Sequence, residues 1–466
     1  MKFKDLLEFT PFATGALLTL MALPATAQNL VIKAGRIVTM TGDDIENGVI
    51  VIEEGRIKAI GKEGEVKLPW SDNTIGGPDH VAFPGFVEAY SNRGMDRANE
   101  NIDVAPFLDI RDSVDPVAYY FEDCLRSGIT TVNLQQGWNC VVGGKGMIVR
   151  PHGMTVEEMM VRPTYGLKMC ASPKSGKSRS TQAQALRGAF TDLRLYLEDI
   201  VRKERDQRGY AKREALFQGK DLDGEKAEGK AMGGSTWKVD GLELIPRGAL
   251  DEKQAPLLRV VEGKQTVFFE CMEAMDIDLA LSVAKDNGFL DKTILVVTAS
   301  CWRGYDAIAK AGVPVILKGS LMATERDPYS GEEIEKFAPE VLAEKGIKFA
   351  LTSANSTTKS LWFQASTAIG MGLDRDAALK AVTTAPAEIL GLKTGSLAPG
   401  QLGNVVLFTG DPLSMTSLVD HVVLEGKHAY DRSTDKRNQQ LLDGAQPTGT
   451  EAAPEEKTDD DVNEDK

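Results

Sequence analysis

Eight short apolar segments alternate with helical sequence in the middle of the chain, and this alternation constrains the fold more than any other feature. Helical stretches such as residues 275–286 and 307–311 lie between most of these segments. Eight strand–helix repeats are typical of an α/β fold of the (β/α)8 TIM-barrel type. The predicted barrel strands are residues 86–91, 129–134, 147–150, 165–170, 266–270, 293–298, 313–318 and 347–353.

Both ends of the chain contain strands of a different kind, in which apolar and polar residues alternate between glycine-containing turns. This alternation is typical of a half-buried sheet. We therefore expect one small composite β-sandwich domain formed by residues 28–80 and 392–430, with the barrel domain spanning residues 81–391. The predicted strands at the two ends are residues 29–39, 48–53, 56–60, 403–408 and 421–424.

The first 27 residues have the pattern of a secretory signal peptide. Lys2 and Lys4 supply positive charge, residues 12–23 are mainly apolar, and Ala25-Thr26-Ala27 resembles a cleavage site. The alternative is an uncleaved anchor, although the apolar run is shorter than the ~20 residues that span a bilayer. We expect an exported protein, periplasmic or secreted, with no membrane span in its mature form.

Two further segments stand outside the predicted domains. Residues 181–235 form an insertion within the barrel, helical at first and then rich in glycine and charge; we expect either a lid over the barrel mouth or a solvated excursion. Residues 431–466 are predicted to be an acidic, disordered tail. The formal net charge of −14 makes nucleic acid a poor partner, because phosphate backbones require basic surfaces.

Five cysteines are present, an odd number with wide spacing. They contain no C-x-x-C pair, so the sequence indicates neither a disulfide framework nor a cysteine zinc site. We expect them to be small buried side chains. They are Cys124, Cys140, Cys170, Cys271 and Cys301.

A series of short motifs resembles the amidohydrolase superfamily, and several of them resemble its imidazolonepropionase-like branch. The first-strand motif is the segment from Ala82 to Asn92, AFPGFVEAYSN. The resemblance covers nearly the whole mature chain to about Tyr430. The other matching segments are residues 127–132, 141–146, 155–159, 166–169, 311–315, 385–391, 395–400 and 410–413.

The resemblance implies hydrolysis of C–N bonds, often in cyclic amides or dipeptides, with one or two divalent metals such as zinc. Histidines and carboxylates at the strand ends would activate a bound water. In this chain the matching positions hold other residues, and only the fourth-strand lysine, Lys168, is retained. The replaced positions are Tyr90 and Asn92 on the first strand, Glu270 on the fifth, Thr298 on the sixth and Ala354 on the eighth.

The four histidines give an independent argument. Only His152 lies within the predicted barrel strands and helices, whereas His80 precedes the first strand and His421 and His428 fall in the terminal sheet. We therefore predict no histidine-rich metal centre at the barrel mouth, and no cofactor.

Two arrangements for the barrel mouth remain open. Glu270, Glu88, Asn92 and Lys168 would form an oxygen-rich site for Mg²⁺ or Ca²⁺ if they converge. Alternatively, a Glu270–Lys168 ion pair fills the vacated position. Tyr90, Trp302 and Trp362 are candidates to line the pocket.

The first hypothesis for function is a catalytically degenerate amidohydrolase, a pseudoenzyme. It would bind a small-molecule ligand in the barrel mouth, or act as a partner subunit in a homo-oligomer or in a hetero-oligomer with an active relative. The alternative is an active hydrolase of carbon–nitrogen bonds with a non-standard metal site.

Overall fold

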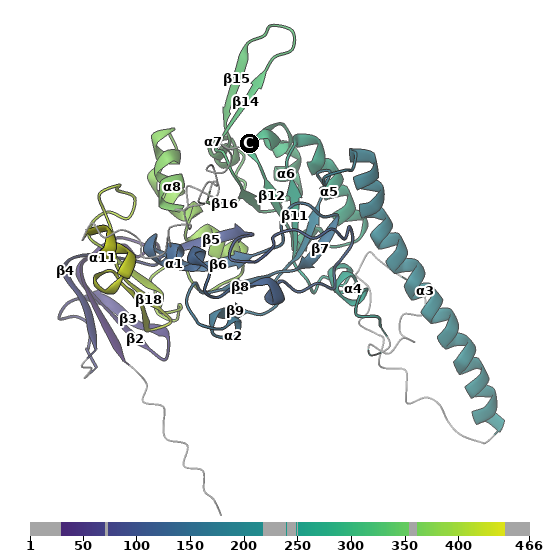
Figure 1. Ribbon diagram of the computed structural model, residues 1–466, viewed down its shortest axis with the longest axis horizontal. Coiled ribbons are helices and arrows are strands. Elements are labelled where there is room, and N and C mark those ends of the chain that lie inside the picture. Colours follow the sequence, from purple (N-terminus) through teal and green to yellow (C-terminus); the bar gives the residue numbers. More distant parts are fainter. Residues whose placement is uncertain are drawn as a thin grey trace, which may run out of the picture.

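A computed structural model describes residues 29–69, 73–217, 239, 248, 250–353 and 361–442. An α/β body occupies the centre of the molecule, and a sheet built from both ends of the chain lies beside it (Figure 1). The predicted signal peptide, residues 218–235 of the insertion and the tail from residue 443 lie outside the described residues.

Seven of the eight predicted barrel strands run parallel, in two groups. The groups adjoin where Tyr165 N donates to Gly146 O at 2.7 Å, and where Ser353, beyond β16, donates to Glu88 on β5. The α/β fold class is thus confirmed. The first group is β5 (Phe86–Ser91) and β6 (Ile129–Leu134), and the second is β10 (Leu167–Cys170), β11 (Val267–Cys271), β12 (Thr293–Val297), β13 (Val315–Leu317) and β16 (Phe349–Leu351).

The third predicted strand differs from expectation because it runs antiparallel. β8 (Met147–Val149) pairs antiparallel with β6 and with β9 (Met160–Arg162), and β7 (Val142–Lys145) pairs antiparallel with β10. A parallel connection requires a crossover of a dozen or more residues, usually a helix. Here the segment before β8 contains β7 instead of a helix, so the chain runs from one strand group directly to the other.

The body has apolar packing inside and outside its parallel strands. Phe268 packs in the interior cluster, whereas Phe269, the next residue, packs in the outer cluster beneath the helices. Successive residues of a strand point to opposite faces of the sheet, so two consecutive apolar residues contribute one side chain to each cluster. The helices are α1 (Tyr119–Arg126), α2 (Val156–Met159), α3 (Arg179–Phe217), α4 (Ala255–Val261), α5 (Ala274–Asp286), α6 (Tyr305–Ala311), α7 (Ala338–Glu344), α8 (Leu361–Gly370), α9 (Arg375–Ala381) and α10 (Thr384–Ile389).

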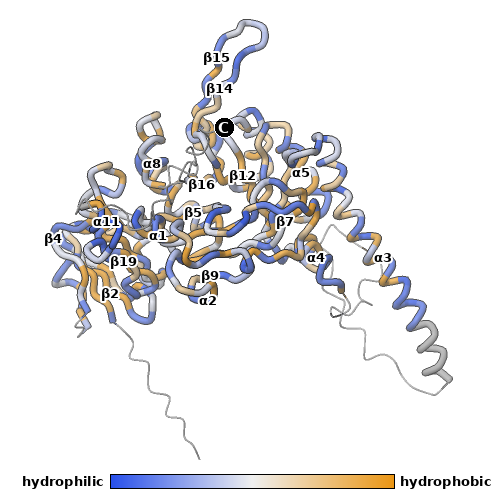
Figure 2. Tube along the Cα trace, viewed as in Figure 1, coloured by the Kyte–Doolittle hydropathy of each residue, from blue (hydrophilic) through white to orange (hydrophobic). Residues whose placement is uncertain are grey.

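Two elements project from the body. Helix α3 confirms the helix expected within the insertion, and its first half is anchored by buried residues such as Leu193 and by Phe190, which stacks on Phe289 at 5.5 Å. Its second half extends away from the body (Figure 1). The sequence did not predict the hairpin of β14 (Met322–Arg326) and β15 (Glu333–Phe337), whose outer part is mainly hydrophilic (Figure 2).

The strands from the two ends of the chain form one seven-stranded sheet, in the order β19-β18-β17-β4-β1-β2-β3. β4 joins the two halves, because it pairs parallel with β1 and antiparallel with β17. Neither β4 nor β19 was predicted. The strands are β1 (Leu30–Ile37), β2 (Ile45–Glu53), β3 (Arg56–Lys62), β4 (Thr74–Phe83), β17 (Val405–Phe408), β18 (Val419–Leu424) and β19 (Lys427–Asp431).

The beginning of the predicted tail is ordered, which corrects the expected boundary at residue 431. η7 (Arg432–Thr434) and α11 (Lys436–Leu442) follow β19. The buried Asp435 receives hydrogen bonds from Arg126 of α1, at 2.7 Å from Nε and 3.1 Å from Nη2. This two-point ion pair attaches the segment to the body.

Two other predictions concern side chains and membrane segments. All five cysteines are buried and free of disulfides, as expected. Among the described helices, none combines the length and the apolar character required to span a bilayer.

Candidate functional site

Lys168 and Glu270 form a buried ion pair at the ends of adjacent parallel strands. Cys170 of β10 pairs with Glu270 of β11. Lys168 lies two residues before Cys170, so its side chain points to the same face of the sheet as Glu270. Lys168 Nζ donates to Glu270 Oε2 and to Tyr90 Oη, the latter at 2.7 Å. Both charged side chains are almost completely buried. The structure thus contains the second of the two arrangements that the sequence left open.

A second lysine, which is not among the residues predicted from the sequence, completes the cluster. Lys318 follows β13, and its Nζ donates to Glu270 Oε1 at 2.6 Å. Its side chain is 28% exposed, whereas that of Glu270 is 2% exposed. The sequence does contain a signal for Lys318, because it lies at the end of an apolar strand segment just as Glu270 does. Two ammonium groups therefore share one carboxylate.

The electrostatics hold this cluster in its charged form. Burial alone would raise the pKa of Glu270, but the two lysines outweigh burial and lower the pKa to about 2. Burial alone would lower the pKa of Lys168, but the Glu270 carboxylate raises it above its ordinary value. Burial raises the pKa of Tyr90 far above its ordinary value, so its hydroxyl stays neutral.

This donor set does not fit a divalent metal. Each oxygen of Glu270 already accepts a hydrogen bond from a lysine, and two ammonium groups repel a dication. The expected contributors Glu88 and Asn92 do not complete an oxygen-rich site. Within the described residues, no hydrogen bond links Asn92 to Glu270 or Lys168.

Glu88 lies instead in a separate buried position on β5. Its carboxylate accepts hydrogen bonds from Ser353, from the backbone N at 3.1 Å and from Oγ. Burial raises the pKa of Glu88 to about 7, because no cation offsets the loss of hydration as strongly as at Glu270.

The remaining predicted positions contribute little to the cluster. Thr298 Oγ1 donates to Met272 O at 2.6 Å, and Trp302 Nε1 donates to Glu325 of β14 at 3.0 Å. Trp362 makes an edge contact with Phe363. Ala354 lies outside the described residues. Of the predicted site residues, the structure therefore brings together Tyr90, Lys168 and Glu270.

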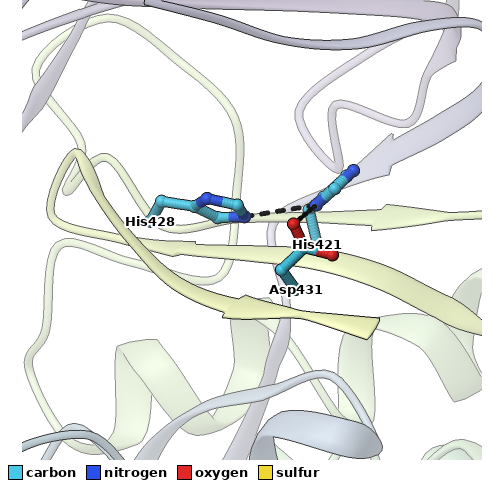
Figure 3. Close-up of side chains that lie close together, drawn as sticks. All are labelled: His421, His428 and Asp431. Atoms are coloured by element: carbon cyan, nitrogen blue, oxygen red, sulfur yellow. Dashed lines mark hydrogen bonds and ion pairs between the residues drawn. The ribbon is translucent and has the colours of Figure 1, made fainter. Parts of the chain in front are cut away.

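The terminal sheet brings together three metal-binding side chains, a grouping that the sequence does not predict. His421 Nδ1 lies 3.2 Å from His428 Nε2 and 3.9 Å from Asp431 Oδ2 (Figure 3). Their ligand atoms all lie within 4.8 Å of one another. The rings of His80 and His421 are 5.9 Å apart between centroids.

The fold is similar to that of solved amidohydrolase structures. An amidohydrolase from Thermotoga maritima MSB8 matches with a TM-score of 0.67 and 22% identity, over 86% of this chain and 100% of that chain. A β-aspartyl dipeptidase from Fervidobacterium islandicum AW-1 matches with a TM-score of 0.45 and 14% identity, over 86% and 97%. No curated protein matches the chain by sequence.

The sequence model of the amidohydrolase family matches residues 262–438. Because the superfamily that the sequence resembles uses divalent metals, and because His421, His428 and Asp431 offer a group of metal ligands, the prediction that no cofactor is involved is wrong. Residues 262–438 thus match the amidohydrolase family in sequence, and the fold of the chain is similar to that of a solved amidohydrolase.

Proposed function

We propose that this chain is a degenerate amidohydrolase whose barrel mouth binds a small anionic molecule. The observation that carries the proposal is the pair of lysines that share the single carboxylate of Glu270. One lysine balances the carboxylate, so the cluster carries one positive charge in excess.

An excess charge next to a buried cluster favours an anionic ligand. Burying an unpaired charge away from water costs roughly several kcal/mol of free energy unless a nearby counter-charge compensates it. Lys168 is fully buried, whereas Lys318 is 28% exposed and stays accessible to a ligand. A carboxylate or phosphate group bound to Lys318 would supply the missing negative charge.

The same residues are poorly suited to activate water. A general base works best when its pKa lies near the working pH, and the pKa of Glu270 is about 2. Glu88 has a suitable pKa of about 7, but its carboxylate is directed to Ser353 and not to the lysine cluster. This contrast supports binding over hydrolysis.

The proposal includes a location outside the cytoplasm, which rests on the signal-like pattern of residues 1–27. A role as partner subunit in an oligomer remains a prediction from the resemblance.

The test is calorimetric titration of the mature chain, starting at residue 28, with acetate, succinate and inorganic phosphate. We expect at least one anion to bind, and Lys318→Met to weaken that binding at least tenfold. Lys348→Met is the matched control, because Lys348 forms an exposed ion pair with Glu388 away from the cluster.

Three results would overturn the proposal. The first is anion binding that Lys318→Met leaves unchanged, and the second is no binding of any of the three anions. The third is metal-dependent hydrolysis of a cyclic amide or dipeptide that Glu270→Gln abolishes and His421→Ala preserves, which would establish the active-hydrolase alternative.

A further inference from the structure

The hairpin of β18 and β19 places three metal-binding side chains on one face of the terminal sheet. His421 of β18 is the direct cross-strand partner of Asp431 of β19, so both side chains share a face. His428 is three residues before Asp431 and would point to the opposite face of a regular strand. A bulge changes this, because Val422 pairs with Tyr430 and Val423 with His428.

The bulge therefore leaves Ala429 unpaired and turns His428 toward His421 (Figure 3). Bulges often redirect a side chain at a functional site. This local irregularity is what brings together three ligands whose spacing in the sequence matches no common metal motif.

The distances suit a small cation. A tetrahedral ion with bonds of about 2.0–2.1 Å separates its ligand atoms by roughly 3.3–3.4 Å. The two imidazole nitrogens are 3.2 Å apart, and His421 Nδ1 is 3.9 Å from Asp431 Oδ2. Small side-chain rotations would bring all three atoms into coordination distance.

The carboxylate is already oriented for this role. Asp431 Oδ1 accepts hydrogen bonds from Ser433, at 2.8 Å from the backbone N and 2.6 Å from Oγ. These contacts fix one oxygen and leave Oδ2 on the side of His421. Such outer partners are typical of metal-ligating carboxylates.

A second layer of polar groups surrounds the cluster. Asp420 Oδ2 lies 3.1 Å from His80 Nε2, and Arg432 contacts the other oxygen of Asp420 at 3.4 Å. His80 Nδ1 is buried and has no hydrogen-bond partner among the described residues. His421 and Asp431 remain 23% and 28% exposed, so an ion could enter from solvent.

We propose that His421, His428 and Asp431 bind a divalent transition-metal ion, with Zn²⁺ as the first candidate, on the terminal sheet and apart from the barrel mouth. Two imidazoles and one carboxylate match the ligand preference of Zn²⁺ and its neighbours, whereas Mg²⁺ and Ca²⁺ prefer oxygen ligands alone. The ion links β18 to β19 and so stabilises the edge of the sheet that joins the two ends of the chain.

The test uses the full mature chain, stripped with EDTA and then titrated with ZnCl₂ by calorimetry, with metal content checked by elemental analysis. We expect one equivalent of Zn²⁺, and a rise in Tm on addition of Zn²⁺. His428→Ala should weaken binding more than a hundredfold, and Ser433→Ala by about tenfold, because it removes one outer partner of the carboxylate.

His152→Ala is the control, since His152 lies outside the cluster, and it should retain full affinity. His428 is exposed, so its replacement should leave the fold intact, as Tm without metal will show. Asp431→Asn is a second variant that retains an acceptor for Ser433. Equal Zn²⁺ binding by wild type, His428→Ala and Asp431→Asn, or no binding by wild type at 100-fold molar excess, would overturn the proposal.

Discussion

The barrel mouth and the terminal sheet satisfy their charged groups in opposite ways. At the barrel mouth, the chain itself supplies the counter-charges, because Lys168 and Lys318 hold Glu270 in the interior. On the terminal sheet, the ligand atoms of His421, His428 and Asp431 lie close together near the surface. A buried carboxylate needs a permanent partner, whereas a surface cluster can obtain its cation from solvent.

The largest effect should come from removing the central carboxylate. Glu270→Ala leaves the buried Lys168 without its counter-charge, and we expect a loss of about 3–5 kcal/mol in the free energy of unfolding. Urea denaturation measures this. The exposed pair Lys348–Glu388 provides the control, because Glu388→Ala should change stability by no more than about 0.5 kcal/mol. Equal effects would show that the barrel-mouth pair is not structurally important.

A second comparison is between Glu88 and Glu270, two buried carboxylates on parallel strands whose contributions to stability depend on pH with opposite sign. The pKa of Glu88 rises from 4.5 to about 7 on folding, so the folded state binds more protons between these values. Its contribution to stability is therefore present below pH 4.5 and is lost as the pH rises through 7. One pKa unit corresponds to about 1.4 kcal/mol, which gives a loss of about 3 kcal/mol.

Glu270 behaves in the opposite way. Its pKa falls from 4.5 to about 2, so its contribution is present above pH 4.5 and is lost as the pH falls through 2. Unfolding measured between pH 5 and 7.5 should show that Glu88→Gln flattens the decline with rising pH. An unchanged slope in Glu88→Gln would contradict the assignment of that decline to Glu88.

A double variant tests whether the ion pair acts as a unit. Glu270→Met leaves the buried Lys168 without a counter-charge, and Lys168→Met leaves Glu270 with the partly exposed Lys318 as its remaining lysine partner. The double variant removes both of the buried charges. We expect the double variant to be at least about 2 kcal/mol more stable than the sum of the single effects implies. A double-mutant cycle by urea denaturation gives this value, and additivity would mean that the two side chains are energetically independent.

Among the variants of the barrel-mouth cluster, the smallest effect on stability is expected for Lys318→Met. Lys168 still balances Glu270, and the side chain of Lys318 is partly exposed, so the loss should be about 1 kcal/mol or less. Thermal unfolding monitors stability, while the same variant loses anion affinity. A loss as large as that of Glu270→Ala would assign Lys318 a structural role in place of a binding role.

The sequence predicted those parts of the fold in which local pattern and final packing agree. Continuous apolar runs located seven parallel strands, because buried parallel strands are apolar on both faces. β4 escaped prediction since its sequence, TIGGPDHVAF, contains two glycines and a proline and shows no clear alternation. Its pairing depends on Gly35, where a Cβ would approach Pro78 O to 2.0 Å.

Contacts within the candidate sites could be predicted only where the two side chains lie on strands that the strand order makes adjacent. Lys168 and Glu270 lie on adjacent strands, so their pairing could be anticipated. Lys318 reaches Glu270 from β13, across β12, and that contact depends on the curvature of the sheet. The cluster of His421, His428 and Asp431 depends on a bulge in β19, which periodicity does not reveal.

The position of β4 between β1 and β17 has a consequence for the time course of synthesis. Partners across this half of the sheet, such as His80 and Asp420, are separated by 340 residues. At roughly 5–20 residues per second, β4 waits about 20–70 s for β17 to emerge from the ribosome. During that interval its free edge is open to pairing with other chains. A chain that ends shortly before residue 405 should therefore aggregate more readily than one that extends past residue 431.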